Sequence, residues 1–289
     1  FKVVTLEGNP FTQFVFQIFI FCAILIIGYT CNFYYLAFLS SRRKEDNSII
    51  EVGEPTITIQ LPIYNEKYVA TRLVDAICQQ DYPKEKMKIM VLDDSDDDTV
   101  ETMSGTVKHY QTLGFDIEHV RRGTRTGYKA GALKHAMKST KSEFVAIFDA
   151  DFIPPTWYLK KAMSHFTSSN IGLVQCRWGH INENYSALTQ AQALNLDFHF
   201  LVEQKAKSNS KLFMNFNGTA GIWRKECIDD AGGWHTATLV EDLDLSYRAQ
   251  MKGWKCLFLP DIVVDAELPV QMNGAKRQQF RWAKGSIQC

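Results

Sequence analysis

The feature that most constrains this chain is a stretch near its start, Gly8 to Ser41, that holds no charged residue. Its apolar part, Phe11–Leu39, exceeds the roughly 20 residues that a helix needs to cross about 30 Å of hydrocarbon. A helix in a soluble core would normally carry a polar face, and a cleaved signal peptide has a shorter apolar region with a small-residue cleavage site. We therefore predict a membrane segment over residues 1–44, with a transmembrane helix at about 11–39.

The residues at the end of this helix predict its orientation. Arg42, Arg43 and Lys44 follow it at once, and positive charge marks the cytosolic side of a membrane helix. Seven cysteines without a C-x-x-C pair suit a reducing compartment and neither a zinc site nor a disulfide framework. We expect an integral membrane protein whose soluble part is cytosolic, in the plasma membrane or, in a eukaryote, the Golgi. Because the chain starts without Met and stops without a helix-ending signal, we also expect it to be a fragment.

After a polar linker, 45–54, the chain has the composition of a soluble globular protein. The full sequence holds 32 basic and 32 acidic residues, and 46% of it is hydrophobic. Nucleic-acid-binding proteins usually carry a basic excess, so the zero balance argues against such a partner. The hydrophobic content excludes a disordered chain.

The soluble part alternates short apolar runs with helical stretches, which predicts an α/β fold with a mainly parallel sheet and helices on both faces. Ligands of such sheets bind at the carboxyl ends of the strands. A later helical pattern, Tyr185–Lys207, is expected to face the core rather than a ligand. The expected strands are 56–64, 88–94, 115–120, 143–151, 171–176 and 255–260, and the expected helices lie near 68–79, 99–113, 130–138 and 157–166.

Two acidic clusters stand at the ends of predicted strands. Asp93 and Asp94 end one strand, where a nucleotide would sit, whereas Asp96–Asp98 are interpreted as a solvated turn. Asp149 and Asp151, two residues apart, would point to one side of an extended strand end. Two converging carboxylates beside a diphosphate are typical of Mg²⁺ or Mn²⁺ sites.

Three further segments each allow two interpretations. In 124–137, a loop with glycines enters a helix, and Lys129 there either binds an anion or is simply exposed. The helix over 237–254 opens with Glu241 and Asp242, which by composition alone is ordinary compensation of the helix dipole. In 276–285, Gln278, Arg281 and Trp282 share one helix face, which suits a diphosphate clamp beside a sugar platform or a basic helix on the membrane surface.

Taken in order, these motifs resemble one family. The series Asp93-Asp94, Asp149-x-Asp151, Glu241-Asp242 and Gln278-x-x-Arg281-Trp282 is similar to that of the processive membrane glycosyltransferases of family 2, which include cellulose, chitin and hyaluronan synthases. The resemblance runs from about Pro55 to Gln288. Phrases such as LPIYNE (61–66), GYKAGALK (127–134), FNGTAGIWR (216–224) and VEDLDL (240–245) resemble most the cellulose-synthase-like A and C groups, which are β-mannan and glucan synthases. Val240 stands where cellulose synthases carry Thr, which argues against cellulose itself.

The resemblance implies a Rossmann-like GT-A catalytic domain over 55–270, an interface helix over 271–289 and further membrane helices beyond it. It also implies Asp242 as general base with Glu241 beside it, and Mg²⁺ or Mn²⁺ as cofactor. The remaining implied roles are Asp93, Asp94, Lys129 and Arg281 for the nucleotide and its phosphates, Asp149 and Asp151 for the metal, and Trp282, Gln278, Phe216, Asn217, Gly218 and Thr219 for the acceptor.

The implied reaction is an inverting transfer of glucose or mannose from UDP-glucose or GDP-mannose to a growing β-linked polysaccharide at a lipid membrane. One in-line displacement at the anomeric carbon needs a carboxylate as base and cations on the leaving diphosphate, and no covalent nucleophile. The alternative enzyme is one that adds a single sugar to a lipid, as ceramide glucosyltransferase does with a similar QxxRW signature. A signalling receiver domain also uses paired aspartates and a lysine, but it would leave Glu241-Asp242 and QQFRW unexplained.

Overall fold

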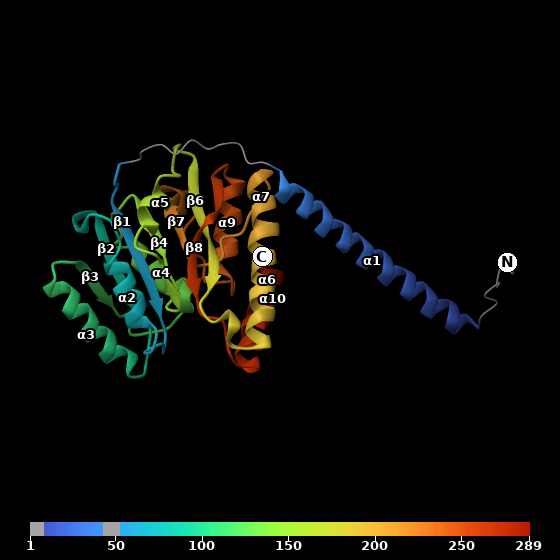
Figure 1. Ribbon diagram of the computed structural model, residues 1–289, viewed down its shortest axis with the longest axis horizontal. Helices are drawn as coiled ribbons and strands as arrows, with labels where there is room; N and C mark the ends of the chain where they lie inside the picture. The colour runs from blue at the N-terminus through green and yellow to red at the C-terminus, as the bar shows by residue number, and fades with distance from the viewer. Residues whose placement is uncertain (1–8, 43–52) are drawn as a thin grey trace.

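The computed structural model describes residues 9–42 and 53–289. The predicted basic pair Arg43 and Lys44 and the predicted linker up to residue 52 lie outside this part of the chain. Helix α1, Pro10–Ser41, covers the predicted span and projects away from the globular part (Figure 1). Its 32 residues would extend about 48 Å at 1.5 Å per residue. It is the one helix among the described residues that is long and apolar enough to cross a membrane.

One eight-stranded sheet forms the centre of the globular part, in the order β3-β2-β1-β4-β7-β6-β8-β5. Strands β3, β2, β1 and β4 run parallel to one another, as β6 and β8 do to each other. The mainly parallel sheet is therefore confirmed. The strand bounds are β1 Ile57–Ile63, β2 Met87–Asp93, β3 Asp116–Val120, β4 Phe144–Ile147, β5 Phe152–Ile153, β6 Ile171–His180, β7 Gly221–Arg224 and β8 Lys255–Ala266.

Strand β7 was not expected from the sequence. It lies between β4 and β6 and runs antiparallel to both, so it joins the two parallel halves of the sheet. The predicted strand 143–151 is also shorter than expected: β4 ends at Ile147, a turn follows, and β5 pairs with β8. The turn is what carries Asp149 and Asp151, so they stand just past a strand and not within one.

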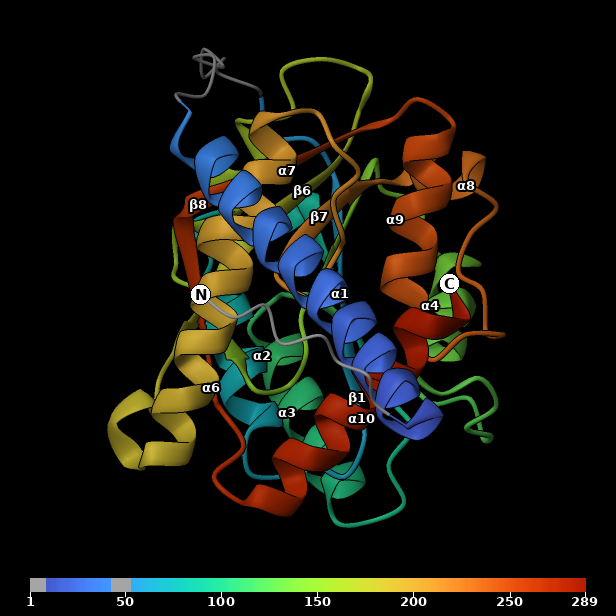
Figure 2. The same cartoon turned by 90° about the vertical axis from the view of Figure 1, so that its right-hand side faces the viewer.

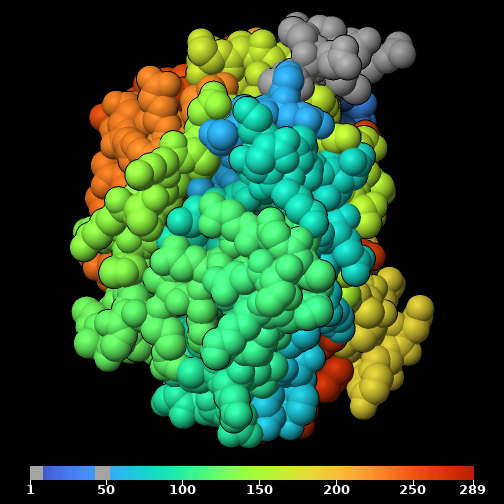
Figure 3. Space-filling view, turned by 90° about the vertical axis from the view of Figure 1, so that its left-hand side faces the viewer, coloured from blue at the N-terminus to red at the C-terminus, as the bar shows by residue number. Residues whose placement is uncertain are grey.

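Helices pack on both faces of the sheet, as predicted. One buried cluster joins β1 and β2 to apolar residues of α2, α3 and α5, and a second joins the other face to α4, α8 and α9. The space-filling view from the β3 side shows the surface formed largely by the residues from α2 to α4 (Figure 3). The helix bounds are α2 Ala70–Cys78, α3 Thr99–Thr112, α4 Tyr128–Met137, α5 Tyr158–Met163, α8 Lys225–Asp230, α9 Glu241–Met251 and α10 Met272–Gln288.

The helical pattern at 185–207 forms three consecutive segments beside α1. They are α6 Ala187–Phe198, the π-helical turn η3 His199–Gln204, and α7 Lys205–Asn209. The expected core-facing stripe is wrong in detail, because Leu194 is 74% exposed and the core receives Phe200 instead. Leu36 and Leu39 of α1 pack on Ala206 at the start of α7. Figure 2 shows α1 crossing this helical layer at the end of the sheet remote from β3.

Candidate active site

The carboxyl ends of β1, β2 and β4 bring the predicted nucleotide residues to one edge of the sheet. Because these strands are parallel neighbours, the residues that follow them emerge side by side. The backbone N–H of Asn65 after β1 donates to the hydroxyl of Ser95 after β2 at 2.9 Å. This hydrogen bond joins the segments that follow β1 and β2 within the protein itself.

Asp93 and Asp94 are both engaged by protein groups. Asp93 is 1% exposed and accepts from the backbone N–H of Ser95 at 2.9 Å and lies 2.8 Å from Nε2 of His119. Burial alone would raise the pKa of Asp93, but the hydrogen bonds from His119 and Ser95 outweigh it and hold the pKa below its ordinary value. Asp94 forms a two-pronged ion pair with Arg122, with 8% of its own side chain exposed. The carboxylate of Asp93 is therefore enclosed by protein groups in this arrangement, and its contact with the base and ribose stays a prediction.

Lys129 connects the DxD turn to the loop that follows α7. It stands on the first turn of α4, directly after Gly127, which has a φ of 73°. Its ammonium donates to Oδ1 of Asp149 at 2.5 Å and to the carbonyl of Gly218 at 3.0 Å. Burial would lower the pKa of Lys129, but the negative charges of Asp149, Glu241 and Asp242 raise it above the usual value. Of its two readings, the anion-site cation is therefore favoured over the exposed lysine.

The Glu241-Asp242 pair opens α9 next to this lysine. A β-carbon placed on Gly218 would lie 2.8 Å from Oδ2 of Asp242 and 3.3 Å from Nζ of Lys129, so all three meet at one point. Burial, and then the charge of Glu241, raise the pKa of Asp242 to about 7 despite the opposing effect of Lys129. Burial likewise raises the pKa of Glu241. A carboxylate whose pKa is near the working pH is suited to accept a proton.

The DxD turn is acidic, and Glu66, which the sequence analysis did not single out as a site residue, adds to it. Burial raises the pKa of Asp151 to about 7, with the charge of Asp149 adding to the effect. Burial also raises the pKa of Glu66 to about 7, and the charges of Asp149 and Asp151 contribute. Glu66 is the last residue of the phrase LPIYNE, whose first three residues end β1, so Glu66 lies three residues past the strand. That position at a strand end was the signal that could have identified it.

The turn fits a divalent cation that shares its ligands with a diphosphate. No three His, Cys, Asp or Glu side chains converge as a complete metal site in residues 9–42 and 53–289. Asp149 and Asp151 supply two hard oxygen ligands, and Mg²⁺ in such sites takes its other oxygens from phosphate and water. The two carboxylates also place negative charge on one turn, which favours a bound cation electrostatically, and the charge of Asp149 contributes to the raised pKa of Asp151.

The loop Phe216–Thr219 contains two side chains that are buried in the protein. The ring of Phe216 is 1% exposed and packs edge-on against Trp223 at 5.4 Å between ring centres. Thr219 is fully buried, and its hydroxyl accepts from the backbone N–H of Asp149 at 2.9 Å. Both side chains therefore support the site from within, and the acceptor contacts of Phe216 and Thr219 stay predictions. Asn217 and Gly218 remain at the site.

Helix α10 presents one face to the domain and the other outward. Ala275 and Gly285 are buried, and Gln278 and Trp282 on the same face are half-buried. Gly285 is needed there, since a β-carbon would approach within 2.4 Å of the Val240 side chain just before Glu241. Arg281 is exposed, and its positive charge opposes the rise that burial causes in the pKa of Glu241, so it lies within electrostatic reach of that carboxylate. The shared face of the motif is therefore confirmed for Gln278 and Trp282, with Arg281 at its margin.

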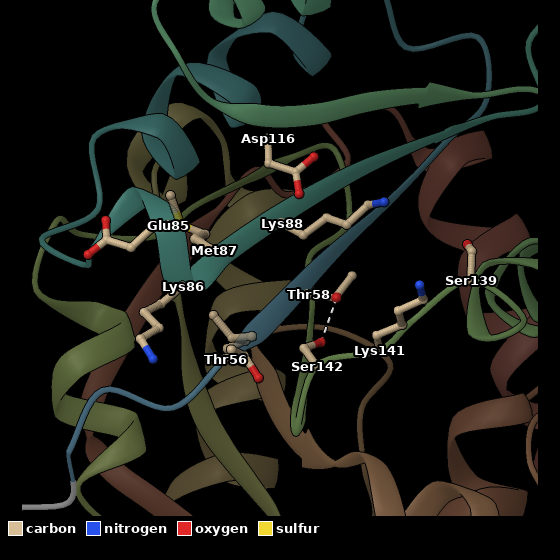
Figure 4. A pocket seen from close by; sticks show the side chains of 11 residues that line it. Thr56, Thr58, Glu85, Lys86, Met87, Lys88, Asp116, Ser139, Lys141 and Ser142 are labelled. Carbon is tan, nitrogen blue, oxygen red and sulfur yellow. Dashed lines mark hydrogen bonds between the residues drawn. The ribbon is translucent and has the colours of Figure 1, made fainter.

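A separate cavity of about 340 Å³ lies at the opposite ends of the strands (Figure 4). It is lined by residues at the starts of β1 and β2 and in the segment before β4, among them Thr58, Lys88 and Lys141. The hydroxyls of Thr58 and Ser142 lie 2.6 Å apart within it. None of the predicted site residues lines this cavity, so it is distinct from the site described above.

Fold and site define a glycosyltransferase domain of the GT-A type, with an apolar helix before it. The family model described as glycosyltransferase like family 2 matches residues 55–285, so the chain belongs to this family.

Individual proteins of similar sequence carry more specific names than the family does. The chain is 42% identical over 236 residues to "Probable glucomannan 4-beta-mannosyltransferase 7" of Oryza sativa subsp. japonica, an alignment covering 80% of this chain and 40% of the relative. It is 41% identical over 246 residues to "Glucomannan 4-beta-mannosyltransferase 2" of Arabidopsis thaliana, covering 83% of this chain and 46% of the relative. The chain thus spans less than half the length of these relatives.

A solved structure supports the fold. A mannosyltransferase from Pyrobaculum calidifontis in complex with GDP-Man and Mn²⁺ superposes with a TM-score of 0.74 at 23% identity, covering 90% of this chain and 69% of that one. The likeness confirms the GT-A fold expected from the sequence.

Proposed function

We propose that the intact protein is an inverting, metal-dependent hexosyltransferase that extends a β-linked polysaccharide, with mannose from GDP-mannose as the donor sugar. The observation that carries the proposal is the meeting of Asp242, Lys129 and Gly218 beside Asp149. This arrangement sets a base and a cation beside the same glycine. The names of the relatives, which share 41–42% of their aligned residues with this chain, favour mannose over glucose.

The proposed chemistry is a single displacement. Asp242 accepts the proton of the acceptor hydroxyl as its oxygen attacks the anomeric carbon, and the bond from that carbon to the nucleoside diphosphate breaks. Such base catalysis contributes about 10²–10⁴-fold. The bound cation supplies charge stabilisation to the leaving diphosphate, and Asp149 and Asp151 would hold it. Lys129 and Arg281 place further positive charge on the same side.

On the donor side, we propose that Asp94 acts through Arg122. The guanidinium that pairs with Asp94 also donates to the carbonyl of Thr126 at 3.0 Å and to that of Tyr128 at 3.2 Å. These bonds order the loop that leads into Lys129. Asp94 would therefore shape the nucleotide and phosphate site even though its own carboxylate is covered.

On the acceptor side, we propose that Asn217 and Gly218 form one wall and that Gln278 and Trp282 of α10 form the other. Trp282 offers a ring on which a sugar can stack. The proposal includes α1 as a membrane anchor, with the catalytic domain on the cytosolic side. This placement follows from the basic residues after α1.

Product analysis tests the proposal. Membranes that contain the intact protein are supplied with GDP-mannose or UDP-glucose, with Mg²⁺ or Mn²⁺, and nucleoside diphosphate release is followed. The expected product is a polymer that β-mannanase degrades and β-glucanase does not. A product cut only by β-glucanase would replace mannose by glucose, and a small lipid-extractable product would replace polymer extension by single transfer.

A further inference from the structure

The π-helical turn η3 is held rigidly against the core. Phe200 is fully buried, with its ring 5.9 Å from that of Phe258 and 5.2 Å from that of Trp178. Wide π-helical turns are rare and are frequently found at functional sites. With Phe200 fixed in the core, the residues on either side of it have defined directions.

A polar face of η3 contacts the loop that carries Asn217. Nδ1 of His199 lies 2.7 Å from Oε2 of Glu203, and Nε2 of His199 lies 3.0 Å from Nδ2 of Asn217. Nε2 of Gln204 donates to Oδ1 of Asn217 at 2.7 Å and to the carbonyl of Asn215 at 2.6 Å. Both the oxygen and the nitrogen of the Asn217 side-chain amide are thus held by neighbouring side chains.

These contacts determine which atoms donate. The amide oxygen of Gln204 accepts from the backbone N–H of Asn215, and its nitrogen donates to the carbonyl of the same residue, so the backbone orients Gln204. Gln204 must then donate to the oxygen of Asn217, which directs the nitrogen of Asn217 to His199. Nε2 of His199 therefore accepts, and the proton resides on Nδ1, where Glu203 accepts it.

Asn217 is joined directly to the residue that stands at the proposed reaction centre. The next residue, Gly218, holds Lys129 through its carbonyl at 3.0 Å and contacts the carboxylate of Asp242. The amide of Asn217 carries two N–H groups, of which one donates to His199. The other is available in chemical terms to a hydroxyl of a sugar.

We propose that His199 is a positioning residue for the acceptor: as a neutral imidazole oriented by Glu203, it holds Asn217 so that the second N–H of that amide donates to a hydroxyl of the acceptor sugar. This inference rests on the proposed function and adds to it a residue that binds neither donor nor metal. It predicts that loss of His199 misplaces the acceptor and leaves the donor site intact.

The decisive readout is the fate of each donor molecule. In the intact protein, the sugar either joins the polymer or is lost to water, and the ratio of the two measures acceptor placement. We expect His199→Phe to lower this ratio at least tenfold, because a misplacement of about 1 Å can reduce a reaction rate 10²-fold. Nucleoside diphosphate binding with Mn²⁺ should stay within about twofold of wild type.

Two related variants separate positioning from a merely structural role. His199→Gln keeps an acceptor toward Asn217 and should recover part of the ratio. In an Asn217→Ala background, His199→Phe should have no further effect, since both changes remove the same interaction. His109→Gln, at an exposed histidine of α3, is the matched control and should leave the ratio unchanged.

The outcomes distinguish the inference from the function on which it rests. If wild type makes no polymer, the proposed function fails. If wild type makes polymer and His199→Phe keeps the same ratio, or lowers extension and hydrolysis equally, the positioning role is overturned. The positioning role would also be overturned if the double variant lowered the ratio by the product of the effects of His199→Phe and Asn217→Ala alone.

Discussion

Replacement of Gly218 by alanine tests the geometry of the site directly. Gly218 has a φ of +85°, and its missing β-carbon would stand 2.8 Å from Oδ2 of Asp242, about 0.6 Å closer than an ordinary contact. The obstructing atom is the end of a side chain, so the carboxylate can retreat without unfolding the protein. Gly218→Ala should therefore displace the proposed base while leaving the fold in place.

The expected loss of stability comes from the backbone alone. A left-handed conformation with a β-carbon costs roughly 1–2 kcal/mol, which lowers Tm by about 2–8 °C in a domain of this size. Gly253→Ala is the matched control, because Gly253 has a φ of +91° and nothing within 4 Å of its added carbon. Both variants should show the same shift of Tm in a thermal melt of the purified protein.

The expected loss of activity separates the two variants. A general base moved by about half an ångström should lower kcat of sugar transfer roughly 10–100-fold, given that about 1 Å can lower it 10²-fold. Gly253→Ala should retain wild-type kcat per folded molecule. Radiolabelled sugar incorporation by membranes, normalised to folded protein, measures both. Equal kcat in the two variants would refute the reasoning that Asp242 is placed by its contact with Gly218.

Three further predictions concern the base, the metal and the loop. Asp242→Asn should abolish transfer and preserve nucleotide-sugar binding. Burial raises the pKa of Asp242 to about 7, and the base acts when it is deprotonated. The kcat/KM of wild type should therefore be low at pH values below about 7 and increase as the pH rises through that value. A flat profile between pH 6 and 8, or turnover by Asp242→Asn, would contradict this assignment. Asp151→Ala should bind GDP equally with Mn²⁺ and with EDTA, whereas wild type should bind more tightly with Mn²⁺; calorimetry that shows no metal dependence in wild type would remove the metal site. Phe216→Ala should lower the free energy of unfolding by about 3–5 kcal/mol, measured by denaturant titration. Unchanged stability with lost acceptor binding would contradict this structural role and support the predicted acceptor contact.

Much of the donor half of the site was predictable because it depends on local pattern. Buried parallel strands read as continuous apolar runs, and polar residues that follow such runs emerge at the ligand edge of the sheet. Asp94, Asp149 and Asp151 follow this rule, and Glu66 follows it too. Asp93 follows the rule in position, and its carboxylate is held by His119 on the neighbouring strand, a contact that the pattern along β2 does not reveal.

The acceptor half was less predictable because it depends on contacts between distant segments. Strand β7 has four residues and no distinctive periodicity, and it forms because it completes the sheet between β4 and β6. The ring of Phe216 packs against Trp223 of that strand, which no spacing in the loop reveals. The helical stripe at 185–207 also differs from the predicted pattern, because from His199 on the π turn changes the angle between successive side chains and Phe200 enters the core.

The sequence by itself determined the long apolar helix, the α/β class, the family and the order of the acidic motifs. These properties depend on composition, periodicity and short spacings, which act within a few residues. Three contacts depend on tertiary structure alone. Asp242 and Lys129 lie beside Gly218, Arg122 forms an ion pair with Asp94, and His199 contacts the amide of Asn217. Each of these joins residues on different elements, so it depends on how the sheet and its helices pack. A charge or hydrogen bond acts over a few ångströms of space, whatever the separation along the chain.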